Sequence, residues 1–217
     1  MAKRFIQSLY GSKHKVKNTR TESDSIGALD IPCDAYYGVQ SLRGYENFHI
    51  TGTKMNNRFI LNIVRIKLAA AIANMKAGSV DKKTGEAIIA ACKEALEGKL
   101  DSGFITDAIQ GGAGTTANMN VNEVIANRAT ELLGGKKGEY LCHPNDHVNC
   151  SQSTNDVIPT AGRITVIELA GELIANVTEL ISSLDKKAEE FNDIIKMGRT
   201  QLEDAVPIRL GQEFAAY

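Results

Sequence analysis

Two short segments rich in small polar residues have the composition of ligand-binding turns. Residues 111–118 read Gly-Gly-Ala-Gly-Thr-Thr-Ala-Asn, and residues 151–156 read Ser-Gln-Ser-Thr-Asn-Asp. A glycine-rich turn that opens a helix presents backbone N–H groups, and the helix N-terminus favours an anion. Their side-chain donors are Thr115, Thr116, Ser153, Thr154 and Asn155. These segments suggest recognition of a carboxylate, and ordinary helix capping is the alternative interpretation.

Residues 142–150, Cys-His-Pro-Asn-Asp-His-Val-Asn-Cys, place two thiols and two imidazoles close together. A zinc site is one interpretation, because zinc is bound by these side chains. The spacing matches no familiar pattern of cysteine and histidine ligands, and no second pair occurs elsewhere in the chain. The favoured interpretations are therefore a structural loop or a secondary anion site that uses His143.

A third polar segment, residues 198–207, reads Gly-Arg-Thr-Gln-Leu-Glu-Asp-Ala-Val-Pro. Its arginine, threonine and glutamine suit recognition of a carboxylate or an ammonium group. A turn that ends a preceding helix is the alternative interpretation.

Helices must position these segments, because apolar residues recur at three-to-four spacing between them. The pattern predicts helices at residues 57–75, 82–96, 116–133 and 156–195. Lys67 falls within the apolar stripe of the first of these helices. Glycines and a proline without a sustained apolar period predict irregular structure at residues 21–50, and residues 142–155 are predicted to be a polar loop. The predicted fold class is mainly α.

The helix predicted at residues 156–195 is far longer than the average of about 11–12 residues for globular helices. Val166, Leu173, Val177 and Leu180 continue one apolar seam along it. A long helix with such a seam needs partners of similar length. The sequence ends at Tyr217, so we expect the partners to come from sequence beyond that residue, from other subunits, or from both.

The composition of the 217-residue chain excludes several classes of partner. The formal net charge of −1 argues against nucleic acid, and no apolar run approaches the ~20 residues of a membrane span. Four scattered cysteines do not resemble a disulfide framework, so reduced thiols and a cytoplasmic location are expected. Residues 1–20 are basic and contain no acid, and they are interpreted as a mobile basic arm.

Four strings resemble the signature segments of the aspartase/fumarase superfamily, in order along the chain. Residues 34–48, which include Asp-Ala-Tyr-Tyr-Gly-Val-Gln-Ser-Leu-Arg and Glu-Asn-Phe, resemble the opening signature. Residues 111–123 resemble the first active-site segment, residues 143–156 the second, and residues 198–214 the third. The resemblance covers residues 20–217 without large gaps.

The resemblance implies an L-aspartase-like fold. The basic arm at residues 1–20 is then followed by a mostly helical N-terminal lyase domain at residues 21–153. Residues 154–217 are expected to begin a central bundle of long helices, which is truncated here. In this family the bundle is built by a homotetramer, and each active site is shared between subunits.

The implied reaction is a reversible anti-elimination from a small dicarboxylate, which gives fumarate through an aci-carboxylate intermediate. Aspartases release ammonia from L-aspartate, whereas fumarases release water. Gln201, where fumarases usually carry histidine, and Thr154 favour an aspartate ammonia-lyase activity. His143 with Asn145 and Asp146 resembles the fumarase secondary site, so class II fumarase is the alternative. Superfamily members also serve as lens proteins, but the intact polar segments argue against a non-enzymatic role.

The resemblance also implies roles for individual residues. Catalytic roles fall to Thr115, Thr154 and Gln201. Substrate contacts are expected from Arg43, Thr115, Thr116, Ser153, Thr154, Asn155 and Gln201. The secondary anion site is expected at His143, Asn145 and Asp146. No metal or other cofactor is required, although divalent cations activate some relatives, and the general-base serine is expected on a loop beyond Tyr217.

Overall fold

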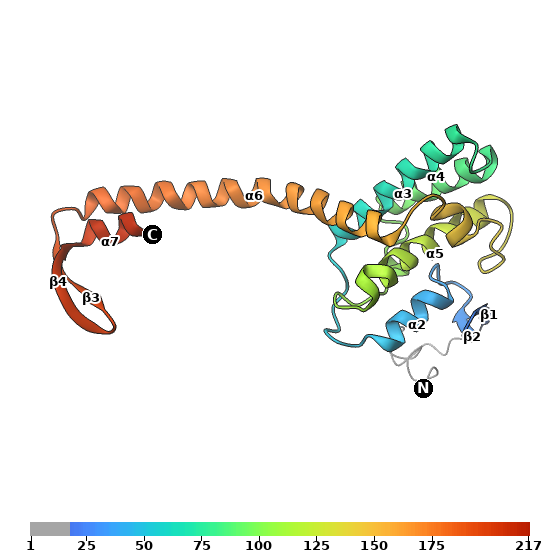
Figure 1. The fold of residues 1–217 in the computed structure, drawn as a ribbon, viewed down its shortest axis with the longest axis horizontal. Helices are drawn as coiled ribbons and strands as arrows, with labels where there is room; N and C mark the ends of the chain where they lie inside the picture. Colours follow the sequence, from blue (N-terminus) through green and yellow to red (C-terminus); the bar gives the residue numbers. More distant parts are fainter. Residues whose placement is uncertain (1–17) are drawn as a thin grey trace. The chain divides into compact units, whose positions relative to one another are not determined.

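The computed structural model describes residues 18–217, and the chain separates into two compact units, Met1–Thr165 and Val166–Tyr217 (Figure 1). The helices are α2 (Val39–Asn47), α3 (Asn57–Ala77), α4 (Lys82–Leu96), α5 (Thr115–Leu132), α6 (Thr154–Glu190) and α7 (Leu210–Ala216). The strands are β1 (Thr19–Asp24), β2 (Gly27–Pro32), β3 (Ile195–Thr200) and β4 (Glu203–Arg209). The short helical turns are η1 (Asp101–Gly103), η2 (Gly112–Gly114) and η3 (Pro144–Val148). The prediction of a mainly α fold is confirmed.

Helices α3, α4 and α5 pack against one another and supply most of the core of the first unit (Figure 1). On α3, Ile60, Ile63 and Val64 are buried, as the three-to-four spacing predicted. Ile88 of α4 and Val124 of α5 belong to the same core cluster. The helices predicted at residues 57–75, 82–96 and 116–133 are therefore confirmed, with ends that shift by at most two residues.

Side-chain and glycine caps fix where α3 and α4 begin and end. The Asn56 side chain accepts hydrogen bonds from the first turn of α3, and Gly78 ends that helix with a left-handed φ of 76°. The Asp81 carboxylate accepts a hydrogen bond from the backbone N–H of Thr84 and begins α4. These local signals explain why the sequence pattern located both helices well.

The prediction of irregular structure at residues 21–50 is wrong. Strands β1 and β2 form an antiparallel hairpin whose register runs from Thr19 opposite Pro32 to Asp24 opposite Gly27, and α2 follows. The strands carry too many polar residues to show a clean alternation. Helix α2 has no capping side chain of its own, so no local signal marks its start.

Two carboxylates that are distant in sequence cap the N-terminus of α2. Glu123 on α5 accepts hydrogen bonds from the backbone N–H groups of Gly38, Gln40 and Ser41, each at 2.9 Å. Glu22 on β1 accepts one at 3.1 Å from the N–H of the first residue of α2. Burial raises the pKa of Glu123 to about 7, while its hydrogen bonds to α2 oppose that shift. The cap depends on the tertiary fold, which ties β1, α2 and α5 together.

The second unit contains most of α6, the β3–β4 hairpin and α7. The hairpin is antiparallel, and the Phe191 and Phe214 rings pack with centroids 5.5 Å apart. The long helix was predicted at residues 156–195, and α6 is indeed one continuous helix, but it ends at Glu190. It ends earlier because residues 195–200 join the hairpin. The turn expected at residues 198–207 is therefore part of a β-hairpin.

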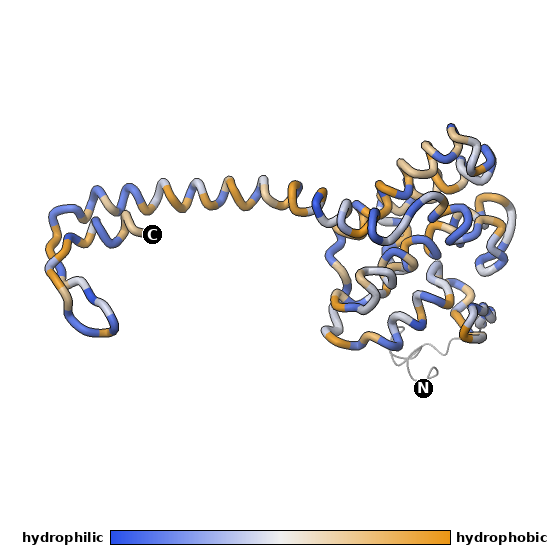
Figure 2. Tube along the Cα trace, viewed as in Figure 1, coloured by the Kyte–Doolittle hydropathy of each residue, from blue (hydrophilic) through white to orange (hydrophobic). Residues whose placement is uncertain are grey.

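The apolar seam of α6 is exposed in the second unit of this chain. Val166, Leu173 and Leu180 have exposed fractions of 65%, 63% and 57%. Figure 2 shows apolar residues recurring along this part of α6. Exposed leucine and valine side chains in a regular row are typical of a surface that packs against other helices.

The sequence predicted a basic arm at the N-terminus and a domain boundary at residue 154. Residues 1–17 of the expected basic arm lie outside the described residues, whereas Arg20 belongs to β1 and forms an ion pair with Glu22. The two compact units meet within α6, after Thr165, and the domain boundary expected at residue 154 remains a prediction.

Among the described residues, no helix combines the length and apolar character of a membrane span.

Candidate active site

The glycine turn before α5 has an unusual backbone. Gly112, Ala113 and Gly114 all have left-handed φ values, of 69°, 51° and 89°. A left-handed alanine costs about 1–2 kcal/mol relative to ordinary helical geometry, and such strain clusters at functional sites. The Thr115 hydroxyl donates a hydrogen bond to the Gly112 carbonyl oxygen at 2.5 Å, which closes the turn. Thr115 itself is exposed at the first position of α5.

Close packing brings the starts of α5 and α6 together. A Cβ atom on Gly114 would lie 2.9 Å from the Ile158 side chain of α6, so only glycine fits there without displacement. On the other side of α5, a Cβ atom on Gly44 of α2 would overlap the methyl group of Thr116. Thr116 is therefore packed through its methyl group against α2, and its expected substrate contact stays a prediction.

A reciprocal cap at the start of α6 uses Ser153 and Asp156. The Ser153 hydroxyl accepts a hydrogen bond from the backbone N–H of Asn155 at 3.2 Å. The Asp156 carboxylate accepts one from the backbone N–H of Ser153 at 3.3 Å. This arrangement is similar to a capping box, except that the Ser153 hydroxyl accepts from the second helical N–H group and not from the third. Capping therefore explains Ser153 but leaves the Thr154 hydroxyl without a capping role.

The Thr154 hydroxyl is held by the amide of Asn118 on α5. The Asn118 Nδ2 atom donates a hydrogen bond to the Thr154 Oγ1 atom at 3.2 Å. Because the hydroxyl oxygen accepts this hydrogen bond, its own proton remains available for a ligand acceptor. Thr154 is half-buried, while Thr115 and Asn155 are exposed. The first unit thus brings two helix N-termini and their hydroxyl donors to one place, which suits a carboxylate.

A buried polar network lies beneath Thr154. Lys67 of α3 has an exposed fraction of 0%, and its Nζ atom donates to Asn149 Oδ1 at 2.7 Å and to Gln152 Oε1 at 3.0 Å. The Nδ2 atoms of Asn118 and Asn122 donate to the same Asn149 oxygen, at 3.1 and 3.2 Å. Burial lowers the pKa of Lys67 to about 7. This network was not predicted as a functional feature.

Signals for the network are present in the sequence. Lys67 occupies a core position of an apolar helical stripe, where an unpaired lysine is rare. Asn118 and Asn149 lie inside the recognised motifs but received no role. A lysine at a core position next to asparagine-rich motifs is the pattern that could have indicated the network.

Arg43 lies with the expected secondary anion site. Its guanidinium forms two hydrogen bonds with the Asp24 carboxylate, at 2.7 and 3.0 Å, and this partner holds the pKa of Asp24 below its usual range. Arg43 and Asp24 line a cavity of about 500 Å³ together with His143 and Asn145. The structure thus groups Arg43 with His143 and Asn145, and its substrate contact stays a prediction.

The loop at residues 142–150 is ordered by its own hydrogen bonds. It contains the π-helical turn η3, which the prediction of a polar loop did not include. The His143 Nδ1 atom accepts a hydrogen bond from the backbone N–H of Asp146 at 3.2 Å, and His147 Nδ1 accepts one from the N–H of His143 at 2.9 Å. Cys142 is buried and Cys150 is partly buried, and both are free thiols. Within residues 18–217, no cluster of three or more histidine, cysteine or acidic side chains is arranged to hold a metal.

Gln201 lies in the second unit, at the tip of the β3–β4 hairpin. The two-residue turn consists of Gln201 and Leu202, with left-handed φ values of 51° and 65°. Such turns are usually made by asparagine and glycine, so this one carries backbone strain. Leu202 has an exposed fraction of 95%. The grouping of Gln201 with Thr115 and Thr154 stays a prediction.

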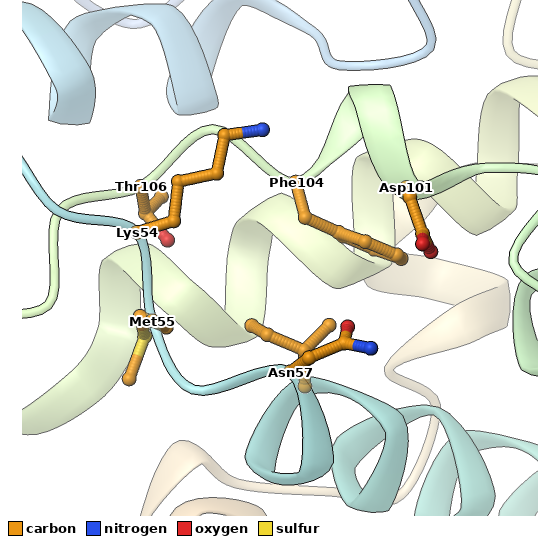
Figure 3. A pocket seen from close by; sticks show the side chains of 7 residues that line it. Lys54, Met55, Asn57, Asp101, Phe104 and Thr106 are labelled. Atoms are coloured by element: carbon orange, nitrogen blue, oxygen red, sulfur yellow. The ribbon is translucent and has the colours of Figure 1, made fainter.

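A further cavity of about 280 Å³ lies between the segment before α3 and the segment after η1 (Figure 3). Met55, Phe104 and Ile60 supply its apolar walls, and the charged residues Lys54 and Asp101 also line it. None of the predicted site residues lines it. The candidate active site is therefore the pair of helix N-termini and not this cavity.

Comparison with known proteins agrees with the motifs and the fold. A model of a lyase family, described as "Lyase", matches residues 27–217. An aspartate ammonia-lyase from a Bacillus species is 53% identical over 201 residues, which are 92% of this chain and 43% of the relative. A solved fumarate lyase:delta crystallin from Brucella melitensis has a TM-score of 0.80 and 48% identity, and the match covers 92% of this chain and 47% of that one. A class II fumarase from Schistosoma mansoni has a TM-score of 0.78 and 39% identity, with coverage of 92% and 42%.

The family model matches most of the length of this chain, so the chain belongs to the aspartase/fumarase superfamily of lyases. The structure corresponds to the N-terminal part of that fold. The chain spans less than half the length of the curated relatives that it matches.

Proposed function

We propose that this chain is part of an enzyme that converts L-aspartate reversibly into fumarate and ammonia. A base removes a proton from the substrate carbon next to one carboxylate, and the negative charge moves into that carboxylate. The carbon–nitrogen bond then breaks, the double bond forms, and the amino group leaves. The difficult step creates an aci-carboxylate dianion, which donors must stabilise.

One observation carries the proposal. The N-termini of α5 and α6 lie close together, and the Thr154 hydroxyl beside them keeps its proton for a ligand. Thr154 accepts a hydrogen bond from Asn118 and so keeps its own proton for another acceptor. Thr116 and Asn155 add donors around the same helix starts, and Thr115 would add its hydroxyl by exchanging its hydrogen bond to the Gly112 carbonyl oxygen for one to the substrate. We assign the two substrate carboxylates to these donors, with Thr115 and Thr154 in catalytic contact. Gln201 is proposed to complete the site.

The proposed amine-releasing activity rests on sequence similarity together with Gln201. Identity is about half with curated aspartate ammonia-lyases, and 39% with the fumarase from Schistosoma mansoni. Gln201 stands where fumarases usually carry histidine. Hydration of fumarate is the second candidate, favoured by His143 and Asn145 beside a cavity. The general base is proposed to be a serine on a loop that these 217 residues do not contain.

The proposed assembly is a homotetramer with active sites shared between subunits. It is supported by the exposed apolar seam of α6, which includes Val166, Leu173 and Leu180. The proposed location is the cytoplasm, supported by four free cysteines. The proposed enzyme requires no cofactor. Activation by a divalent cation, as in some relatives, is compatible with the proposal.

The test uses the full-length protein, because the proposed site includes a serine outside these residues and segments from other subunits. Purified enzyme is mixed with L-aspartate, and fumarate formation is followed by ultraviolet absorbance. We expect steady release of fumarate with an equal amount of ammonia. Release of fumarate from L-malate alone would establish the fumarase alternative. Absence of turnover with both substrates would establish a non-enzymatic member of the superfamily.

A further inference from the structure

The buried Lys67 is not explained by stability. A cation with an exposed fraction of 0% loses its hydration, and within residues 18–217 no carboxylate forms an ion pair with it. Among the described residues, the Cys92 thiol of α4 is the ionisable group that acts on Lys67, and burial raises the pKa of that thiol to about 12, so it is neutral near pH 7. The α5 helix and the loop at residues 149–152 contribute neutral amides. An apolar residue of the same size would avoid this cost, so the presence of a lysine here points to a role in the site.

Two buried amide oxygens add to the cost. The Oδ1 atoms of Asn118 and Asn122 are buried, and within the described part of the chain they have no hydrogen-bond partner. An unsatisfied buried acceptor is destabilising. Flipping either amide would exchange the positions of its Oδ1 and Nδ2 atoms. The Oδ1 atom would then face the Asn149 Oδ1 atom, and two acceptors would meet without a proton between them. Something in the network therefore fixes which way these amides point.

The donors of Lys67 fix that direction. An ammonium can only donate, so Asn149 and Gln152 must present their oxygens to it. Gln152 confirms this polarity, because its Nε2 atom donates to the carbonyl oxygens of Val148 and Cys150. Asn118 meets the same Asn149 oxygen and must present its Nδ2 atom. That Nδ2 atom is then the group that faces Thr154 Oγ1.

We propose that Lys67 is a positioning residue that sets the hydrogen-bond polarity of this network and so makes the Thr154 hydroxyl a donor to a ligand carboxylate. Lys67 also ties the loop at residues 149–152, which leads directly into Ser153 and Thr154, to helix α3. The lysine does not touch the substrate. Its complete burial without a carboxylate partner among residues 18–217 is a further sign of a group retained for function. The inference rests on the proposed function, in which Thr154 holds a substrate carboxylate.

The test is Lys67→Met in the full-length enzyme, with Lys76→Met as control. Lys76 lies exposed at the end of the same helix. We expect Lys67→Met to lower kcat/KM for L-aspartate about tenfold, a size typical of coupling through such a network. Its melting temperature should change little, because the loss of the hydrogen bonds to Asn149 and Gln152 is offset by the removal of a buried cation that has no counter-anion. A purely structural lysine gives the opposite result, a lower melting temperature with normal kinetics.

A double-mutant cycle shows whether Lys67 acts through Thr154. We expect Lys67→Met combined with Thr154→Ala to cost little more activity than Thr154→Ala alone. Fully additive losses overturn the proposal. If Lys67→Met does not fold, Asn118→Ala is used in its place, because it removes the amide that links Asn149 to Thr154. Its loss of activity must then also be less than additive with that of Thr154→Ala.

Binding of succinate, measured by calorimetry, separates this proposal from the proposed function. If the wild-type protein does not turn over L-aspartate, the proposed function fails. The role of Lys67 is then tested by succinate binding alone. The dissociation constant of succinate should be about tenfold higher for Lys67→Met than for the wild type. Equal succinate affinity in wild type and Lys67→Met overturns the role of Lys67, whichever substrate the enzyme uses.

Discussion

Replacing Thr154 with alanine separates a catalytic role from a structural one. The α6 cap is made by Ser153 and Asp156, so the replacement leaves that cap intact. The folded protein loses one hydrogen bond, from Asn118 Nδ2 at 3.2 Å, and Asn118 keeps its second bond to Asn149 at 3.1 Å. One such bond contributes about 0.5–1.5 kcal/mol to the free energy of unfolding. The melting temperature should therefore fall only slightly.

The expected effect on catalysis is much larger. Loss of one preorganised donor to a developing oxyanion typically lowers the rate by about 10²–10³-fold. We therefore expect kcat/KM for L-aspartate to fall by about 100-fold in Thr154→Ala, which corresponds to about 2.7 kcal/mol of transition-state stabilisation. Thr154→Ser, which keeps the hydroxyl, should retain most of the activity. The Thr154 hydroxyl oxygen accepts the hydrogen bond from Asn118, so a serine hydroxyl can keep that bond and still offer its proton to the ligand.

The assay combines aspartate kinetics, thermal melting and light scattering on the same preparations. A folded variant of normal size with a 100-fold loss supports the assignment. Activity within about threefold of wild type, far below the loss of an oxyanion donor, refutes the reasoning and makes Thr154 a packing residue. A large fall in melting temperature would show instead that the cap has been misassigned.

Three further predictions concern the cap of α2, the buried lysine and the seam of α6. Glu123→Gln puts an amide N–H against the backbone donors of α2, so it should lower the free energy of unfolding by about 1–3 kcal/mol in denaturant titrations, whereas the exposed Glu86→Gln should change it little. The folded pKa of Lys67 is lowered to about 7, so the unfolded chain binds the extra proton above that pH. Stability should rise from pH 7 towards pH 10 and less so in Lys67→Met, and parallel pH curves would contradict this. Leu173→Glu should reduce the oligomer size of the full-length protein in light scattering, whereas Ser182→Glu on the opposite face should not, and equal sizes would remove the seam from the interface.

The parts of the fold that were predictable from sequence carry their own local signals. Helices α3 and α4 have an apolar stripe together with caps at Asn56 and Asp81, and their bounds were close. Helix α2 was missed because its N-terminus is capped by Glu22 and Glu123, which are remote in sequence. The long helix was recognised, but its end was placed too late because the apolar period continues past Glu190 into the hairpin.

The candidate site shows the same division. The motifs located the starts of α5 and α6 and the hydroxyls of Thr115 and Thr154. The sequence could not show that Ser153 caps α6 while Thr154 faces Asn118, because both hydroxyls have the same local chemistry. The substrate contact of Arg43 stays a prediction, and the sequence did not indicate that the fold pairs Arg43 with Asp24 beside His143. Such pairings depend on contacts between segments that are far apart in the chain.

The most direct test of the proposed function is the substrate preference of the full-length enzyme. The measurement is kcat/KM for L-aspartate and for L-malate on one preparation, each followed by the absorbance of fumarate. The account predicts that L-aspartate is strongly preferred, because Gln201 replaces the histidine usual in fumarases. A higher kcat/KM for L-malate would contradict it.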